Sequence, residues 1–363
     1  MSVLQREELE ESPLADLHAI ASELGLEGFR SMRRDELVGA ILRAQGEDDR
    51  DEREPDEVPA DEALDAPPAA TVVEPAPEAE PEEAEEPPPE RIVSGVLDIL
   101  PNGSGFVRME VAAHSLDDVY VSSAQIRRCE LRAGDEISGP VRPARRHERH
   151  PSLIHVESVN GADPEPPEQR PHFGDLTAVF PSERLAAPPA LEGVPYGKGS
   201  RVAVSGPPGA GGTTLLREIV QVLGERHPEL RVQVVLAGVR PEEVAEWGGE
   251  VAGGSFDRSP EAQAQAAELA VERAKRRVER GEHAAIAIDS LDPLPPGARR
   301  RVFGAARATA EGGSLTVFAV TGEASEALRW ATTRIVLEPA GPDSRGPSVA
   351  GARSGSLRAD QLR

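Results

Sequence analysis

This sequence has a single cysteine and no long apolar run, and these shortages exclude several classes of protein. Cys129 is the single cysteine among 363 residues, so an intrachain disulfide and a cysteine-rich zinc site are both excluded. No apolar run reaches the roughly 18 residues that a membrane-spanning helix needs, and the first residues contain no apolar segment typical of a signal peptide. We therefore expect a cytoplasmic protein with no membrane partner.

Acidic residues outnumber basic ones, but most of the excess lies in one segment. The net charge is −24, yet residues 47–90 contain 19 acidic and 2 basic residues, which leaves −7 for the rest of the chain. This segment is rich in Glu, Asp, Pro and Ala, and it cannot bury enough apolar surface to offset the entropy of ordering. We expect a disordered linker here, so the net charge says little about whether the folded surfaces bind nucleic acid.

Residues 1–46 predict a small helical module. Ser12 and Pro13 are typical of a helix start. Apolar residues recur at helical spacing after them, at Leu14, Leu17, Ile20, Ala21 and Leu24. A second apolar face consists of Leu37, Val38, Ile41 and Leu42. A unit of this size has a marginal core. The pattern leaves open whether the module contacts nucleic acid or serves as a docking or spacer element.

Residues 91–165 predict a small closed β-barrel. Alternating apolar and polar residues, separated by turn signals, indicate five strands, in RIVSGVLDIL, FVRMEV, VYVSSAQI, GDEISGPV and LIHVESV. Phe106, Arg108 and Tyr120 are of the types that stack on bases and contact phosphates of single-stranded RNA. Between Arg127 and His150 there are seven arginines and four acidic residues. The competing interpretation is that these aromatic residues belong to a core or to an ordinary surface.

Residues 166–363 predict an α/β domain with a parallel sheet. The apolar strands RVAVSG, RVQVVLAG, AAIAIDS and SLTVFAV alternate with helical segments such as TTLLREIVQVLGERH and PEAQAQAAELAVERAKRRVERG. This alternation is typical of parallel strands joined by crossover helices. A glycine-rich segment, GPPGAGG, lies between the first strand and the first helix. Strand, loop and helix in this order indicate a nucleotide-binding loop.

The glycine-rich loop lacks the lysine that such loops normally carry. Gly206, Gly211 and Thr213 fit the pattern G-x-x-x-x-G-K-[ST], and Gly212 occupies the lysine position. The glycines allow backbone N–H groups to approach phosphates, and Thr213 is a candidate Mg²⁺ ligand. Without the lysine, charge on the β- and γ-phosphates is not neutralised; of the only two lysines, Lys198 precedes the strand and Lys275 lies far beyond it. The candidate nucleotide-binding residues are Gly206, Pro207, Pro208, Gly209, Ala210, Gly211, Gly212, Thr213 and Thr214.

The barrel segment resembles the cold-shock-type RNA-binding barrel of the bacterial transcription termination factor Rho family. The sequences SGVL, GFVR, DDVYVS, AQIRR, LRAGDEISG and VRP occur in the family order. The resemblance implies that the barrel binds single-stranded, preferably cytosine-rich RNA. It carries the RNA-binding role to Phe106, Arg108, Asp118, Tyr120, Glu148 and Arg149. Ser104 and His150 stand where the family has aromatic residues, which implies a weaker or altered RNA preference.

The α/β segment resembles the RecA-type ATPase domain of the same family. The sequences RPEEV at 240–244, FGAAR at 303–307 and EGGSLT at 311–316 match family motifs. The resemblance places Asp289, at the end of IAIDS, at the position associated with Mg²⁺. It also implies a hexameric, RNA-dependent ATPase and helicase.

Several family features of the motor are replaced or missing. Gly209 and Gly212 replace both lysines of the family loop PPKAGKT, and Val239 occupies the region where the family has a catalytic glutamate. The two RNA-translocating loops are absent. Arg345 is a candidate remnant of the arginine finger, although its spacing to Arg353 does not match cleanly. ATP and Mg²⁺ are therefore expected to bind weakly or not at all.

These features predict a multidomain α/β protein with four parts. They are a helical N-terminal module (1–46), an acidic linker (47–90), a five-stranded barrel of the OB or cold-shock type (91–165) and a RecA-like P-loop domain (166–363). The leading hypothesis is a Rho-like termination factor with an impaired motor that binds nascent RNA. Its partners would include RNA polymerase and a homohexamer or a mixed ring with a full-length paralogue. Two alternatives remain: an active RNA-dependent ATPase that terminates transcription, and a non-enzymatic protein-interaction module.

Overall fold

The computed structural model describes residues 91–109, 115–145, 148–166, 169–248, 251–339, 341 and 346–363, together with Leu17, Val38 and Ile41. These last three residues are helical and buried, as the apolar spacing predicts. The remainder of the predicted helical module and the acidic linker lie outside the described residues. The predicted domain boundaries stay a prediction.

The barrel is built from short strands and one helix. Its elements are β1 (Arg91–Ile99), β2 (Gly105–Arg108), β3 (Val119–Val121), α4 (Ser123–Arg128), β4 (Glu136–Arg142), β5 (Ser152–Leu153) and β6 (Ser158–Val159). The strand order is β1-β2-β3-β5-β4-β6, and an additional antiparallel pairing of β1 with β4 closes the sheet. Buried aliphatic residues such as Leu97, Val107 and Ile137 fill the interior. The prediction of a small closed barrel is confirmed.

Two details of the predicted barrel are wrong. The segment SAQI forms helix α4 instead of continuing a strand, because Ser122 and Gln125 cap the helix start reciprocally. The predicted last strand, LIHVESV, is divided into the two-residue strands β5 and β6, and both of them pair with β4.

The second domain alternates strands and helices. Its strands are β7 (Ala178–Val179), β8 (Arg201–Ser205), β9 (Leu230–Val239), β10 (Val251–Ser255), β11 (His283–Asp289), β12 (Arg307–Thr309), β13 (Ser314–Thr321), β14 (Thr333–Val336) and β15 (Gly355–Ser356). Its α-helices are α5 (Gly212–Arg226), α6 (Pro241–Val244), α7 (Pro260–Glu279), α8 (Pro296–Gly304) and α9 (Ala327–Trp330). Short 3-10 helices are η2 (Phe173–Asp175), η3 (Pro189–Leu191), η4 (Gly351–Arg353) and η5 (Ala359–Gln361).

The predicted parallel sheet is confirmed. Strands β10, β9, β11, β13, β8 and β14 are neighbours in that order, and all of these pairings are parallel. The short strands β7, β12 and β15 add antiparallel pairs at the margins. The glycine-rich loop follows β8, and Asp289 ends β11. Both therefore lie at the carboxyl edge of the sheet, where ligands bind in open α/β sheets.

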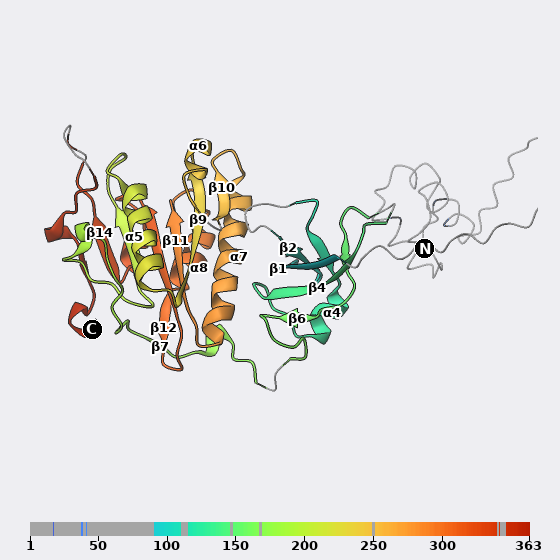
Figure 1. Ribbon diagram of the computed structural model, residues 1–363. Helices are drawn as coiled ribbons and strands as arrows, with labels where there is room; N and C mark the ends of the chain where they lie inside the picture. Colours follow the sequence, from blue (N-terminus) through green and yellow to red (C-terminus); the bar gives the residue numbers. More distant parts are fainter. Residues whose placement is uncertain are drawn as a thin grey trace, which may run out of the picture. The chain divides into compact units, whose positions relative to one another are not determined.

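Helices pack against both faces of this sheet (Figure 1). Leu215, Leu216 and Ile219 of α5 pack in one cluster with Val202 and Val204 of β8. The intervening Ala203 belongs to the cluster on the other face, because successive side chains of a strand point to opposite faces. There α7 and α8 contribute apolar residues, which include Ala267, Ala270, Val302 and Phe303.

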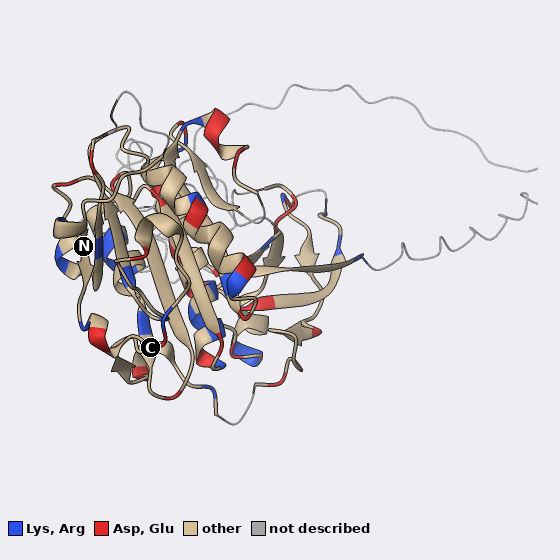
Figure 2. Ribbon diagram, turned by 60° about the vertical axis from the view of Figure 1, so that its left-hand side comes forward, with Lys and Arg blue, Asp and Glu red and all other residues tan. Residues whose placement is uncertain are grey.

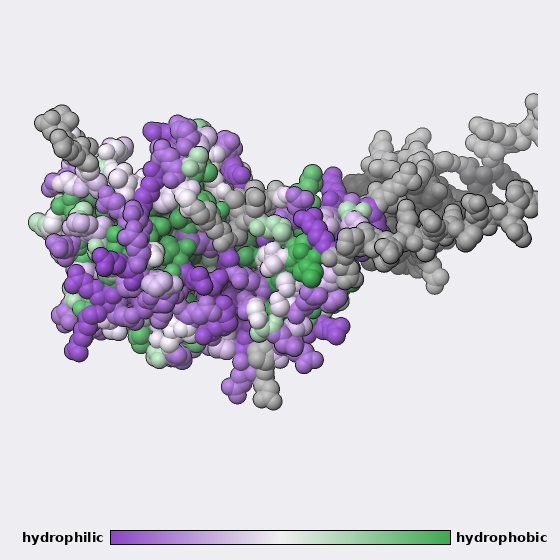
Figure 3. All heavy atoms as spheres, in the orientation of Figure 1, coloured by the Kyte–Doolittle hydropathy of each residue, from purple (hydrophilic) through white to green (hydrophobic). Residues whose placement is uncertain are grey.

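The surface of the described residues is predominantly polar. Acidic and basic segments are interspersed over the α/β domain (Figure 2). Hydrophilic residues dominate the face seen in Figure 3, with smaller hydrophobic patches between them. Among the described residues, no helix has the length and apolar character needed to cross a membrane.

Candidate RNA-binding surface and nucleotide loop

An aromatic cluster lies on the barrel surface. The register of β2 and β3 places Phe106 directly opposite Tyr120, with ring centroids 5.8 Å apart. His150 joins them from the segment before β5, and its ring centroid lies 5.0 Å from that of Phe106. Tyr120 is 38 % exposed. The structure thus brings together both predicted stacking residues and adds His150 as a third ring.

Arg108 and Asp118 belong to a buried hydrogen-bonded network next to this cluster. The Arg108 guanidinium is buried, donates to Asp98 at 2.7 Å and also donates to Asp118. It lies 5.4 Å from the centre of the Phe106 ring. Gln265 of α7 donates to the same oxygen of Asp98 at 3.0 Å. Both predicted RNA-binding residues are therefore committed to a buried ion-pair network, and Asp98 is a member that the sequence patterns did not single out.

The other predicted RNA-binding residues lie on the loop between β4 and β5. Arg142 donates two hydrogen bonds to the carboxylate of Glu148, at 2.6 and 2.9 Å. These bonds, with the backbone N–H of Arg145, lower the pKa of Glu148 to about 2. Arg149 is exposed. Ser104, at the position where the family has an aromatic residue, is buried, and its hydroxyl donates to Asn102.

The glycine-rich loop has the backbone conformation that its glycines permit. Gly209 and Gly211 have φ angles of 80° and 89°, values that residues with a Cβ rarely adopt. Helix α5 starts at Gly212, so its first N–H groups are directed toward the loop. A cavity of about 390 Å³ lies beside the loop and is lined by Gly206, Pro207, Pro208, Gly209, Ala210, Gly212 and Thr213, among others. Nine consecutive residues were predicted to bind a nucleotide, and seven of them line this cavity.

Thr213 and Asp289 meet at the edge of the cavity. The Thr213 hydroxyl donates to Asp289 Oδ1 at 2.9 Å. Asp289 is 3 % exposed, and its Oδ2 has no hydrogen-bond partner among the described residues. Burial raises the pKa of Asp289 above its ordinary value. A hydroxyl and a carboxylate oxygen fit the ligand preference of Mg²⁺, so these two residues could hold the metal of a bound nucleotide.

No described basic residue lines this cavity. Its charged lining residues are Asp292 and Glu323, and both are acidic. Lys198 lies just before β8, at the opposite end of that strand from the loop, and it pairs with Glu183 at 2.5 Å and Glu229 at 3.2 Å. The ammonium group of Lys198 is therefore paired with carboxylates away from the loop. Arg345, the candidate arginine finger, lies outside the described residues.

Val320 of β13 blocks the position of the missing lysine. A Cβ atom built on Gly212 would lie 2.9 Å from Val320 Cγ1, closer than real Cβ contacts allow. Val239, in the region predicted to lack a catalytic glutamate, is buried in the apolar cluster of α5. No local sequence signal marks Val320, because the contact depends on how β13 and α5 are brought together.

Asp292 links two turns at the rim of the cavity through hydrogen bonds. Its carboxylate accepts hydrogen bonds from the Gly322 backbone N–H at 2.6 Å and from the hydroxyls of Thr321 and Ser325, each at 3.0 Å. The turn after β11 is thereby fixed to the turn after β13. From the sequence, we expect the two RNA-translocating loops of the family to be missing at these turns, and Asp292 was not among the predicted site residues.

Comparisons with known proteins show which proteins this chain is similar to. A family model described as "Rho termination factor, RNA-binding domain" matches residues 93–165, and one described as "Rho termination factor, N-terminal domain" matches residues 8–50. The chain is 35 % identical to transcription termination factor Rho of Aquifex aeolicus, over 88 % of this chain and 74 % of that protein. It is 39 % identical to the Bacillus subtilis protein of the same name, over 62 % of each chain.

A third relative extends over a similar range. Transcription termination factor Rho of Pseudomonas fluorescens is 31 % identical, over 86 % of this chain and 75 % of that protein. Among solved structures, an ATPase of a type III secretion system aligns with 58 % of this chain and 74 % of its own, at 18 % identity and a TM-score of 0.43. That structural likeness is too distant to add to the sequence matches.

Proposed function

Because the chain belongs to the transcription termination factor Rho family, we propose that it binds single-stranded, cytosine-rich RNA with its barrel while its ATP-driven motor is impaired. It would act in termination as an RNA-binding regulator rather than as a translocase. One observation carries the proposal: the cavity at the glycine-rich loop is lined by two carboxylates and by no described cation.

The aromatic cluster supports the RNA-binding half of the proposal. Stacking of a base on an aromatic side chain contributes about 1–3 kcal/mol per base, and Phe106, Tyr120 and His150 form a contiguous set of rings. The buried ion pairs of Arg108 fix its guanidinium 5.4 Å from the centre of the Phe106 ring. The surface is therefore preorganised, which reduces the entropy lost when RNA binds.

The missing cation supports the second half. A cation about 4 Å from a phosphate charge contributes roughly 4 kcal/mol at an effective dielectric constant of about 20. The residues that line the loop cavity lack that contribution, because the two charged ones, Asp292 and Glu323, are acidic. Thr213 and Asp289 would hold Mg²⁺, and the metal would supply part of the missing positive charge. Even so, Val239 cannot orient or deprotonate an attacking water.

Partners follow from the same proposal. Single-stranded RNA is the primary ligand, and RNA polymerase is the expected protein partner in termination. The chain would form a hexameric ring of its own or join a mixed ring with a full-length paralogue. In a mixed ring, a subunit that binds RNA without hydrolysing ATP would slow the other subunits.

A titration with a cytosine-rich oligonucleotide tests the proposal. Fluorescence anisotropy at two stated salt concentrations, with and without Mg-ATP, should give the same affinity whether or not nucleotide is present. The affinity should fall as salt rises, because phosphate contacts release counterions. A large change of RNA affinity on adding Mg-ATP would contradict the impaired motor. Absence of RNA binding would instead favour a protein-interaction module.

A further inference from the structure

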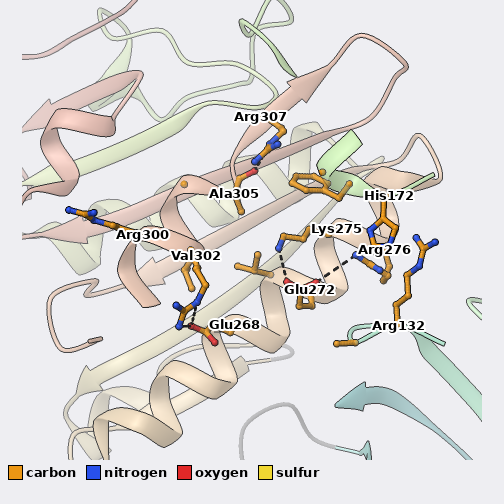
Figure 4. A pocket seen from close by; sticks show the side chains of 16 residues that line it. Arg132, His172, Glu268, Glu272, Lys275, Arg276, Arg300, Val302, Ala305 and Arg307 are labelled. Carbon is orange, nitrogen blue, oxygen red and sulfur yellow. Dashed lines mark hydrogen bonds and ion pairs between the residues drawn. The ribbon is translucent and has the colours of Figure 1, made fainter. Parts of the chain in front are cut away.

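A second pocket, larger than the cavity beside the glycine-rich loop, lies away from both sites. It measures about 650 Å³ and is bounded by α7, α8 and the turn η2. Figure 4 shows the side chains that line it. A volume in this range is typical of pockets for small molecules.

Basic side chains dominate the lining. The six cationic residues are Arg132, Lys275, Arg276, Arg300, Arg301 and Arg307, and the two acidic residues are Glu268 and Glu272. A positive pocket on a chain with a net charge of −24 attracts anions locally. The cavity at the glycine-rich loop has the opposite sign.

Arg307 is the most distinctive cation of this pocket. Its guanidinium carbon lies 4.5 Å from the centre of the Phe173 ring, and Nε donates to the carbonyl of Ala305 at 3.3 Å. Within the described ranges, its terminal nitrogens have no hydrogen-bond partner and no carboxylate lies within ion-pair distance. Burial lowers the pKa of this guanidinium. Arg307 is partly exposed, and its terminal N–H groups can donate to an anion that enters the pocket.

The surrounding residues are held in place. The backbone N–H of the buried Phe173 donates to Glu279 at 2.8 Å, and Lys275 Nζ lies 5.7 Å from the same ring. Lys275 pairs with Glu272 at 2.6 Å, and Arg301 pairs with Glu268 at 2.5 Å. Arg300 extends away from the other labelled side chains in Figure 4, toward Glu326 and Trp330. Among the described cations that line the pocket, Arg307 therefore lacks a carboxylate partner, and an anion would compete with Glu272 for Lys275 and with Glu268 for Arg301.

We propose that this pocket binds the diphosphate group of a small phosphorylated ligand, at a site separate from the glycine-rich loop. Arg307 would supply a pair of parallel N–H donors to one phosphate, as guanidinium groups do. Lys275 and Arg301 would contact the second phosphate. Inorganic pyrophosphate and a nucleoside diphosphate share this chemistry. The proposal does not depend on whether the barrel binds RNA or the motor is impaired.

Isothermal titration calorimetry of the full chain with inorganic pyrophosphate, and separately with ADP, tests this site. Arg307→Gln and Arg301→Gln should each weaken pyrophosphate binding about tenfold or more, since each removes hydrogen bonds from a charged donor. Arg301 is well exposed, so its variant should fold even if Arg307→Gln does not. Two controls should bind like the parent: Arg334→Gln removes an exposed arginine outside the pocket, and Thr213→Val alters the glycine-rich loop.

The outcomes separate the possible sources of binding. ADP binding that shows the same losses supports the site and indicates a nucleotide ligand. Unchanged pyrophosphate affinity in Arg301→Gln and in a folded Arg307→Gln overturns the proposal, as does loss of binding in Thr213→Val. The proposal is also wrong if pyrophosphate fails to bind while a cytidine oligonucleotide without a terminal phosphate binds and requires Arg301.

Discussion

Val320 and Gly212 are predicted to be coupled, and alanine substitutions at both positions measure that coupling. A Cβ at position 212 would lie 2.9 Å from Val320 Cγ1 and 3.7 Å from Cγ2. Val320 is β-branched and has little rotamer freedom with which to move its methyl group aside. Placing an extra carbon in such a space costs about 1–3 kcal/mol.

A double-mutant cycle isolates this cost from other effects. Gly212→Ala also gains up to about 1 kcal/mol of helix propensity, so the single variant alone is ambiguous. That gain occurs with or without Val320 and cancels in the cycle. Since Val320→Ala removes both close methyl groups, the pair should show a coupling energy of about 1–3 kcal/mol in favour of the double variant.

Urea denaturation followed by circular dichroism measures the four free energies of unfolding. Gly224→Ala combined with Val320→Ala is the matched control, because Gly224 lies in the same helix and its added Cβ would meet no atom within 4 Å. The control pair should show no coupling. A coupling energy near zero for positions 212 and 320 would refute the view that Val320 fills the space beside the loop.

Three further predictions follow from the barrel and the loop. Phe106→Ala and Tyr120→Ala should each weaken binding of a cytosine-rich oligonucleotide by about 1–3 kcal/mol, whereas Phe256→Ala, which removes an exposed ring outside the barrel, should not; unchanged affinity in both barrel variants would remove the stacking surface from the account. Arg108→Met should lower the free energy of unfolding by roughly 3–5 kcal/mol, because it leaves two buried aspartates unpaired, and a loss below about 0.5 kcal/mol, typical of a surface change, would show that the network is not structural. Burial raises the pKa of Asp289. Its protonated carboxyl therefore contributes to the free energy of unfolding fully below about pH 4, and this contribution is lost as pH rises through the pKa of the folded state. Asp289→Asn should therefore become more stable relative to the parent as pH rises from about 4 to about 7, and a pH-independent difference would contradict this.

The sheet and the glycine-rich loop were predictable because their signals are local. Apolar runs of strand length marked β8, β9, β11 and β13, and the glycine spacing marked the loop between β8 and α5. The shorter strands β10 and β14 carry weaker patterns, since VAGGS contains two glycines and TRIV has only four residues. Helix α4 was missed even though Ser122 and Gln125 form a readable capping signature.

The geometry of the sites was less accessible from the sequence. Phe106 and Tyr120 were identified by residue type, but the burial of Arg108 between Asp98 and Asp118 depends on the register of β1, β2 and the turn before β3. The contact between Gly212 and Val320 joins residues more than 100 positions apart. Side-chain period shows which face a residue occupies, but it does not show which residue lies opposite.

Without a cation and a catalytic carboxylate, the loop is not expected to support ATP hydrolysis. Phosphate release by the purified, unmodified chain, measured with Mg-ATP in the presence and absence of polycytidylate, tests this expectation most directly. We predict that polycytidylate binds and that phosphate release stays at the background rate. RNA-stimulated turnover by this chain would contradict the account and would favour an active terminating ATPase.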